Sequence, residues 1–340
     1  MSKIRREEIK KILCIKPRGI GDILLSTIVL ENLNAVFPQS EIHYLTEEFA
    51  KRAVENNSFV SKLLSFNKND FVISIIKKVR KEKYDLVFDF WSNPKTAQIT
   101  FLSGAKYRVG YEKPGRKYAY NYRGKNGTMG KHSAEDNLVL LKSLEIPVVS
   151  KKIIYRTTNE EKDFAENYFE ANISKSNGPV IGIIPSGGWK SKRCDAAKWI
   201  EICENIREKF NTQFLILWGQ GDENDAQNIF QVLKQYSILG PKTTFGQLSG
   251  LIEKCELIIA NDSGPMHVSA ALGRRTLGIF GPTDPEAHRP YSENSYFVIH
   301  SELHCIKCNK LVCPFKHECM IELSAQKVLN EVSKLLVSND

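Results

Sequence analysis

One stretch of the sequence, NDSGPMHVSAALG at 261–273, combines an acid, a hydroxyl, a glycine and a histidine within seven residues. It directly follows an apolar run that is typical of a buried strand, and Pro265 suits the first position of a helix. The N–H groups at the start of such a helix are free, and the helix dipole makes them attractive to an anion. A purely structural helix start is the alternative. The stretch predicts a phosphate-binding turn made by Asp262, Ser263, Gly264 and His267.

A second turn of this kind, IPSGGWKSKRCDAAKW, follows the apolar run 180–184. Its small residues would let the backbone approach a phosphate closely. They are Ser186, Gly187 and Gly188. Lys192 and two neighbouring cations would place positive charge where a diphosphate leaving group becomes negative. A solvated basic turn is the alternative.

The third turn, KPRGIGDILLS, follows the run 11–16. Gly19 and Gly21 allow a tight turn, and the helix that follows offers free N–H groups. Asp22 lies where that helix begins, so its carboxylate is either a helix N-cap or a general base for an attacking hydroxyl. Leu24 stands where a dinucleotide fingerprint requires its third glycine, which argues against a dinucleotide.

Short apolar runs alternate with helical stretches through both halves of the chain, which is typical of an α/β fold with doubly wound parallel sheets. Strands are predicted at 11–16, 41–45, 62–66, 84–90 and 107–110, and again at 180–184, 213–218, 237–239, 256–260 and 276–280. At 340 residues the chain exceeds the usual limit of one hydrophobic core, so two domains are expected. Ligands of such sheets bind beyond the carboxyl ends of the strands, where all three turns lie.

The composition points to a globular protein with an anionic partner. Hydrophobic residues make up 42% and charged residues 26% of the chain, and the net charge is +9. No apolar run approaches the roughly 20 residues of a spanning helix, and the start of the chain lacks the apolar region of a secretory signal. We therefore expect a cytoplasmic protein.

A cluster of cysteines occupies the stretch CIKCNKLVCPFKHEC near the end of the chain. Its members are Cys305, Cys308, Cys313 and Cys319. Four thiols so close together are a candidate structural site for zinc or an iron–sulfur cluster, with His304 or His317 as a substitute for one thiol. The second, separated pair that is typical of zinc sites is missing, so free thiols are the alternative.

The segment 113–131 combines basic and aromatic residues and contains no acid. Its cations are Lys113, Arg116, Lys117, Arg123, Lys125 and Lys131. Basic residues interleaved with tyrosines favour a single-stranded nucleic acid or an acidic glycolipid as the partner, and a solvated loop is the alternative.

Four blocks of the sequence resemble, in order and spacing, the bacterial ADP-heptose:lipopolysaccharide heptosyltransferase family, glycosyltransferase family 9. The blocks are KPRGIGDILLSTIVLENLNAVFP, HSAEDNLVLLKSLEIP, IPSGGWKSKRCDAAKWIEI and NDSGPMHVSAALGRRTLGIFGPTDP. The resemblance implies a GT-B fold, with two facing Rossmann-like domains and a cleft between them. It also implies inverting transfer of a heptose from ADP-heptose to a lipopolysaccharide core or a related phosphorylated glycolipid, with no cofactor required. Transfer of another nucleotide sugar for capsule or glycan assembly is the alternative within this class.

The resemblance also implies roles for particular residues. Asp22 resembles the family's catalytic base, and Lys192 resembles the lysine that meets the diphosphate. The donor is expected at Ser186, Gly187, Gly188, Lys192, Glu223, Asp262, Ser263, Gly264 and His267. The acceptor side is expected at Lys16, Arg18, Gly21, Arg116, Lys117 and Arg123.

We therefore expect an acceptor-side domain at 1–155, a linker region at 156–178 and a nucleotide-sugar-binding domain at 179–322. The segment 323–340 is expected to be a helix that packs back on the N-terminal domain. The expected partners are a nucleotide-sugar donor and an acidic glycolipid at the cytoplasmic face of the inner membrane, without nucleic acid.

Two other classes remain open at this point. A nucleic-acid-binding protein with a cysteine–metal module would leave the matched strand-end turns unexplained. A nicotinamide oxidoreductase is disfavoured by the missing third glycine of the dinucleotide fingerprint.

Overall fold

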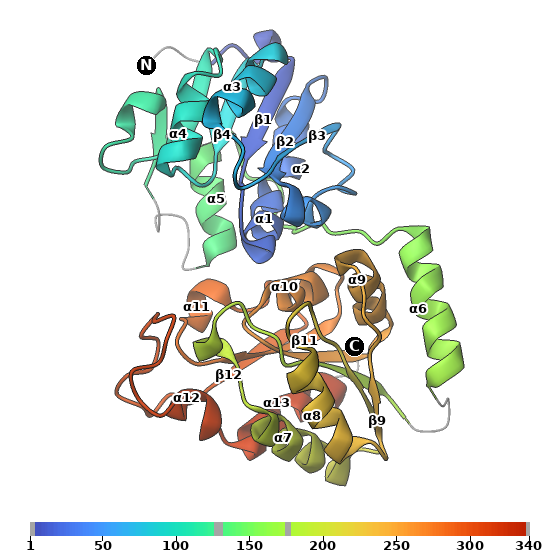
Figure 1. Cartoon of the computed structure of the whole chain (residues 1–340). Coiled ribbons are helices and arrows are strands. Elements are labelled where there is room, and N and C mark those ends of the chain that lie inside the picture. Colours follow the sequence, from blue (N-terminus) through green and yellow to red (C-terminus); the bar gives the residue numbers. More distant parts are fainter. Residues whose placement is uncertain (1–3, 126–131, 174–177, 338–340) are drawn as a thin grey trace. The chain divides into compact units, whose positions relative to one another are not determined.

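The structure, a computed structural model, describes residues 4–125, 132–173 and 178–337. The chain divides into two compact units, Met1–Arg156 and Thr157–Asp340. Each unit is a parallel sheet with helices on both faces (Figure 1). The predicted doubly wound α/β fold is therefore confirmed for both units.

The sheet of the first unit has the strand order β3-β2-β1-β4-β5-β6 within the described residues. Its strands are β1 (Lys11–Ile15), β2 (Glu41–Glu47), β3 (Lys62–Phe66), β4 (Leu86–Asp89), β5 (Tyr107–Tyr111) and β6 (Tyr122–Gly124). All neighbouring pairs are parallel, and the order reverses between β1 and β4, which makes this the topological switch point. The sequence analysis missed β6, because three residues within a basic stretch carry no apolar run.

Helices α3 and α4 cover one face of this sheet, and α1, α2 and α5 cover the other (Figure 1). The α-helices are α1 (Ile20–Ser26), α2 (Leu30–Val36), α3 (Val72–Lys81), α4 (Pro94–Phe101) and α5 (Ser133–Lys142). The 3₁₀ helices are η1 (Arg6–Glu8), η2 (Thr27–Val29), η3 (Glu48–Ala53) and η4 (Lys117–Ala119). Each of α1, α3 and α4 starts just beyond the carboxyl end of a strand, so these helix starts surround one edge of the sheet.

The second sheet has the order β12-β11-β10-β7-β8-β9 within the described residues. Its strands are β7 (Val180–Ile184), β8 (Gln213–Ile216), β9 (Ser237–Leu239), β10 (Leu257–Asn261), β11 (Arg275–Phe280) and β12 (Ser295–Ile299). Counted from its own first strand, this sheet repeats the order of the first, with the switch point between β7 and β10. The sequence analysis did not predict β12.

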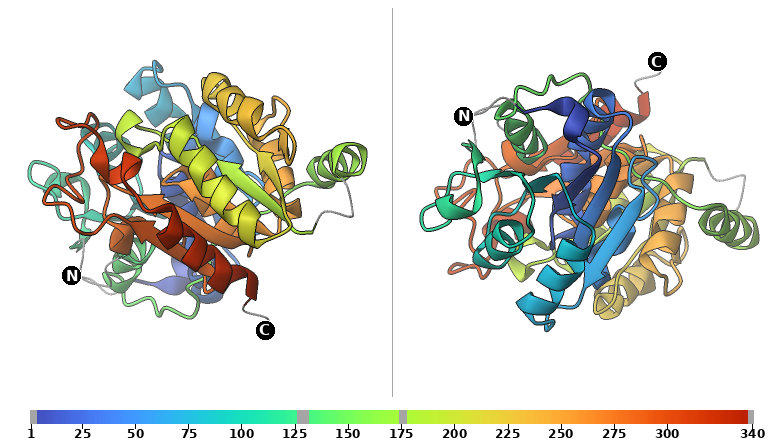
Figure 2. Two further views of the ribbon diagram at one scale, coloured as in Figure 1. Left: turned by 90° about the horizontal axis from the view of Figure 1, so that it is seen from below. Right: turned by 90° about the horizontal axis from the view of Figure 1, so that it is seen from above.

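Helices α7, α8 and α13 lie on one face of the second sheet, and α9 and α10 lie on the other (Figure 2). The helices of this unit are α6 (Asn159–Asn172), η5 (Lys190–Lys192), α7 (Ala196–Lys209), α8 (Glu223–Leu233), α9 (Phe245–Lys254), α10 (Gly264–Ala271), α11 (Pro285–His288), α12 (Glu318–Ile321) and α13 (Ala325–Val337). The start of α10 directly follows β10, as the sequence predicted for the turn at 261–273.

Two segments pack differently from the sequence expectation. The segment 156–178, expected as a linker region, contains α6, which packs against α9 so closely that a Cβ at Gly250 would collide with the Glu161 carbonyl. The segment 323–340 was expected to pack on the first domain. Its helix α13 instead packs on α7, β11 and β12, and its apolar side belongs to the core of the second unit. Both segments therefore contribute to the second unit, because each presents apolar or small residues to helices of that unit.

Candidate active site

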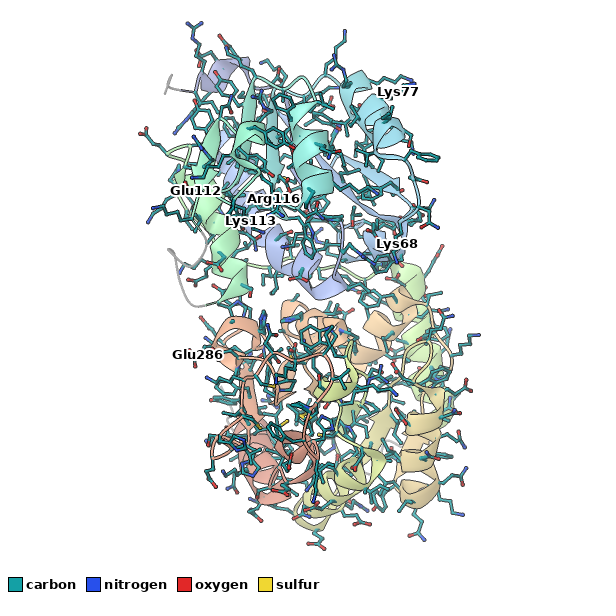
Figure 3. All side chains as sticks on the ribbon, turned by 60° about the vertical axis from the view of Figure 1, so that its left-hand side comes forward. Lys68, Lys77, Glu112, Lys113, Arg116 and Glu286 are labelled. Atoms are coloured by element: carbon teal, nitrogen blue, oxygen red, sulfur yellow. The ribbon has the colours of Figure 1, made fainter. Side chains whose placement is uncertain are left out.

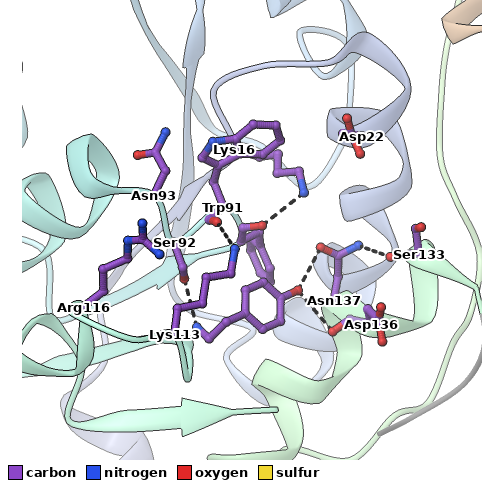
Figure 4. A pocket seen from close by; sticks show the side chains of 12 residues that line it. Lys16, Asp22, Trp91, Ser92, Asn93, Lys113, Arg116, Ser133, Asp136 and Asn137 are labelled. Carbon is purple, nitrogen blue, oxygen red and sulfur yellow. Dashed lines mark hydrogen bonds between the residues drawn. The ribbon is translucent and has the colours of Figure 1, made fainter. Parts of the chain in front are cut away.

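A cavity of about 360 Å³ lies at the switch point of the first sheet. The loops after β1, β4 and β5 and the first turn of α5 form its walls (Figure 4). Its charged lining residues are Lys16, Asp22, Lys113, Arg116 and Asp136. This is the position at which parallel sheets of this order bind their ligands.

Asp22 lies in the first turn of α1 and lines this cavity. It is not the N-cap, which is Gly19 with a φ of +79°. The carboxylate folds back over Gly19, so that a side chain at that glycine would collide with Asp22 Oδ2. Asp22 is half-buried, and no hydrogen bond or ion pair within the described residues involves its carboxylate. An uncommitted carboxylate on the wall of a cavity is suited to accept a proton.

Two lysine amines of the cavity donate to successive carbonyls of the turn that follows β4. Lys16 Nζ donates to the Phe90 oxygen at 3.1 Å, and Lys113 Nζ donates to the Trp91 oxygen at 2.9 Å. Burial lowers the pKa of Lys16, an effect that the nearby Asp22 opposes, and burial lowers the pKa of Lys113 as well. Within the described part of the chain no carboxylate forms an ion pair with either lysine. Their positive charge is therefore available to an anionic ligand.

The turn after β4 is fixed by Asp89, whose side chain is fully buried. Its carboxylate accepts hydrogen bonds from the N–H groups of Trp91 at 3.0 Å and Ser92 at 2.8 Å, and from the Tyr120 hydroxyl at 2.7 Å. Ser92 has a φ of +50°, a left-handed conformation that costs free energy for a residue other than glycine. Burial raises the pKa of Asp89, although these hydrogen bonds act in the opposite direction. This turn was not predicted from the sequence. The feature that could have indicated it is a polar stretch directly after a predicted strand.

The structure gathers part of the predicted acceptor side. Arg116 lines the cavity together with Lys16, and Gly21, which directly precedes Asp22 in α1, does not. Three further predicted residues do not line the cavity: Arg18, Lys117 and Arg123. The first two each pair with a glutamate, at 3.3 and 2.6 Å, and the third is exposed on β6. Lys131 lies outside the described residues.

In the second unit, the loops after β7 and β10 meet at the switch point. Lys192 Nζ lies 2.6 Å from Asp262 Oδ2, and the Thr283 hydroxyl donates to the same oxygen at 2.7 Å. Asn261, at the end of β10, donates to the Pro185 carbonyl of the β7 loop at 2.7 Å. The predicted lysine and aspartate therefore form one ion pair, and Asn261, which the sequence analysis overlooked, ties their two loops together.

The same two loops, after β7 and β10, carry buried hydroxyl groups without a hydrogen-bond partner among the described residues. The hydroxyls of Ser186 and Ser263 are buried and have no hydrogen-bond partner in the described residues. Ser263 precedes Gly264, the first residue of α10, and His267 is buried one turn further along the helix. Because buried polar groups are nearly always bonded, unbonded hydroxyls in the loop after β7 and at the start of α10 are suited to a polar ligand.

Arg193 fixes the glycine-rich loop of the second unit. Its Nε donates to the Gly187 carbonyl at 2.7 Å, and its guanidinium pairs with Asp222 at 2.7 Å. Glu223, predicted near the donor, is exposed at the start of α8, directly after Asp222. Gly188 is exposed at the tip of the loop. The acidic residue that Arg193 binds most closely is thus Asp222, and the donor-side role of Glu223 stays a prediction.

The four cysteines of the predicted metal site, Cys305, Cys308, Cys313 and Cys319, line one small cavity with His317. All four are free thiols, and burial together with the neighbouring thiols raises the pKa of Cys319 to about 12. Within the described ranges no three His, Cys, Asp or Glu residues are arranged to hold a metal ion. The expectation of a structural zinc or iron–sulfur site is therefore not supported.

Two doubly wound units, each with polar residues at its switch point, are the architecture of the GT-B class of glycosyltransferases. The family model of glycosyltransferase family 9 (heptosyltransferase) matches residues 72–318, more than half of the chain. The chain belongs to this family. It is 28% identical to lipooligosaccharide heptosyltransferase 2 of Campylobacter jejuni, over 96% of this chain and 99% of that protein.

Solved structures share the fold. A family 9 glycosyltransferase from Veillonella parvula superimposes with a TM-score of 0.83 at 20% identity, covering 97% of this chain and 98% of that chain. The Escherichia coli ADP-heptose LPS heptosyltransferase II superimposes with a TM-score of 0.77 at 22% identity, covering 96% and 98%. These structures extend the match over both units of the chain.

Proposed function

We propose that this glycosyltransferase moves a heptose from ADP-heptose to the core of a lipopolysaccharide or a related phosphorylated glycolipid. The observation that carries the proposal is the Asp22 carboxylate, which lines a cavity whose two lysines form no ion pair with a carboxylate among the described residues. The names of the similar Campylobacter and Escherichia proteins, which specify heptose transfer to such glycans, support the choice of sugar and acceptor.

On the acceptor side, Asp22 takes the proton from an acceptor hydroxyl. The hydroxyl oxygen attacks the anomeric carbon of the donor sugar, the bond from that carbon to the diphosphate oxygen breaks, and ADP leaves with the electron pair. A single displacement of this kind inverts the anomeric configuration. Lys16, Lys113 and Arg116 bind an acidic group of the acceptor and so orient the hydroxyl toward Asp22.

On the donor side, the diphosphate binds at the start of α10 and draws Lys192 away from Asp262. Ser186 and Ser263 supply hydroxyl donors, and the helix dipole adds partial positive charge. These groups stabilise the negative charge that develops as ADP departs, so the chain itself provides the electrostatic help that the leaving group needs. Asp262, released from Lys192, is then free to accept a hydrogen bond from the donor.

The site of action that fits this reaction is the cytoplasmic face of the inner membrane, where a glycolipid acceptor presents its head group. Among the helices of the described residues, none has the length and apolar character that crossing a bilayer demands. We propose that the glycolipid acceptor, rather than a segment of this chain, is what the bilayer holds.

The proposal is tested by offering the purified protein a heptose-deficient lipopolysaccharide with ADP-heptose, UDP-glucose or GDP-mannose. Mass spectrometry of the acceptor is expected to show addition of one heptose with ADP-heptose and no addition with the other two donors. Transfer of a different sugar, with no transfer of heptose, would replace the proposed donor and leave the family assignment intact.

A further inference from the structure

The outer side of α3, in the first unit, carries large apolar groups that no other element covers. Phe71 and Ile73, at the start of the helix, are 84% and 67% exposed. The opposite side of the helix, with Ile75, Ile76 and Val79, packs into the core of the unit. Exposed aromatic and aliphatic side chains at adjacent positions are typical of a contact surface.

Exposed cations continue this surface along the helix and into its flanking loops. They are Lys68, Lys77, Lys78, Arg80, Lys81 and Lys83. The range 68–83 contains two acids, Asp70 and Glu82, and Glu82 already pairs with Lys62 at 2.7 Å. No ion pair within the described residues neutralises the three lysines of the helix itself. Figure 3 shows two of these cations on the same side of the first unit.

We call the surface formed by Lys68, Phe71, Ile73, Lys77, Lys78 and Lys81 the α3 face. It begins at the edge of the sheet that carries the acceptor cavity, because β3 ends at Phe66 and the chain then enters α3. Lys95 lies between the acceptor cavity and the start of the α3 face. It is the second residue of α4, directly after the turn that lines the cavity, and its amine donates to the Asp70 carbonyl at 3.4 Å.

We propose that the α3 face docks on a bilayer that contains anionic lipids. The inference rests on the proposed function, since a glycolipid acceptor is itself held in such a bilayer. Phe71 and Ile73 enter the head-group region, and the lysines lie among the lipid phosphates, each strengthening binding by roughly fivefold. The start of the α3 face, with Phe71 and Ile73, lies at this edge, so docking through it brings the bilayer next to the cavity proposed for the acceptor.

The test is co-sedimentation of the full chain with vesicles of phosphatidylcholine alone or mixed with phosphatidylglycerol. The wild-type chain is expected to bind the mixed vesicles and to bind the neutral ones at least tenfold more weakly. Each lysine near an anionic surface strengthens binding by ~5-fold, so the loss of attraction for two or more lysines exceeds tenfold. The variants Lys77→Glu/Lys78→Glu and Phe71→Ser/Ile73→Ser are expected to lose at least tenfold in binding to the mixed vesicles. All four side chains are exposed, so thermal unfolding should stay unchanged.

The matched control is Lys234→Glu/Lys242→Glu, which makes the same change of charge on exposed lysines of the second unit. Wild-type binding by this control is expected. If the control loses as much binding as Lys77→Glu/Lys78→Glu, the attraction is nonspecific and the α3 proposal is overturned. The proposal is also overturned if the α3 variants bind as tightly as the wild-type chain, or if the wild-type chain does not bind the mixed vesicles.

A transfer assay separates this proposal from the proposed function. The α3 variants should transfer heptose at the wild-type rate to an acceptor dispersed in detergent, and more slowly to an acceptor held in vesicles. If the wild-type chain transfers nothing even in detergent, the proposed function fails while the vesicle result stands on its own. A loss of transfer by the α3 variants in detergent would show that these residues act on catalysis and would overturn docking as their role.

Discussion

At the scale of single residues, the two sites differ in how their charges are balanced. Lys192 and Asp262 form an ion pair at 2.6 Å, so on the proposed donor side a diphosphate would compete with Asp262 for the lysine. Asp22 and Lys16 form no ion pair with each other: Lys16 donates to a carbonyl, and no hydrogen bond of the Asp22 carboxylate is found in the described residues. The proposed acceptor side therefore keeps one carboxylate for a proton and one amine for an anion.

Lys16 gives the reaction a pH dependence whose sign follows from its lowered pKa. Burial favours the neutral amine, so Lys16 loses its charge at a lower pH than an ordinary lysine. The KM for an acidic acceptor should therefore rise as the pH increases toward the ordinary lysine value of about 10.4. Because arginine stays charged, Lys16→Arg should flatten this rise even though Lys113 keeps its own lowered pKa. The measurement is KM against pH for both proteins; parallel profiles would exclude Lys16 as the titrating group.

At the scale of elements, the sequence predicts the parts with regular periodicity and misses those that depend on contacts distant in sequence. The apolar runs locate β1, β7 and β10, and the turns that follow them carry the predicted chemistry. The turn after β4 escaped prediction: Asp89 holds it by local hydrogen bonds, but the Tyr120 hydroxyl that also binds Asp89 lies far along the chain. Within the expected linker region, α6 was not predicted although Thr158 and Glu161 form a capping box at its start, and its packing on α9 leaves little trace in the local sequence.

The turn after β4 should behave as a positioning element for acceptor binding. Asp89→Asn replaces an acceptor-only carboxylate with an amide, which weakens the hydrogen bonds that hold Ser92 in its left-handed conformation. The Phe90 and Trp91 carbonyls then no longer hold the two lysines in place. We expect KM for the acceptor to rise roughly tenfold, as for the loss of one charged hydrogen bond, with a smaller change in kcat.

A purely structural role for Asp89 would leave a different signature. It would lower the folded fraction and reduce kcat without a selective rise in KM for the acceptor, and Asp89→Glu would not restore acceptor affinity. The KM for the donor provides the internal control, because the donor groups lie in the second unit.

At the scale of the whole molecule, one architecture is used twice. Both sheets have the same strand order relative to their own first strand, and each carries a polar site at the switch point. This repeat could be predicted from the sequence, because the alternation of apolar runs and helices begins again at about residue 180. We propose that acceptor chemistry belongs to the first unit and donor binding to the second. A substitution in one unit is therefore expected to impair one of these two functions and leave the other intact.

The measurement that tests this claim most directly compares transfer and ADP binding in Asp22→Asn and Lys192→Gln. Asp22→Asn should lower kcat by about 10²- to 10⁴-fold, the range for loss of a general base, and leave the affinity for ADP unchanged. Lys192→Gln should weaken ADP binding, and Asp163→Asn, on the exposed side of α6, should change neither. If Asp22→Asn transfers heptose within tenfold of the wild-type rate, Asp22 is not the base and the account is contradicted.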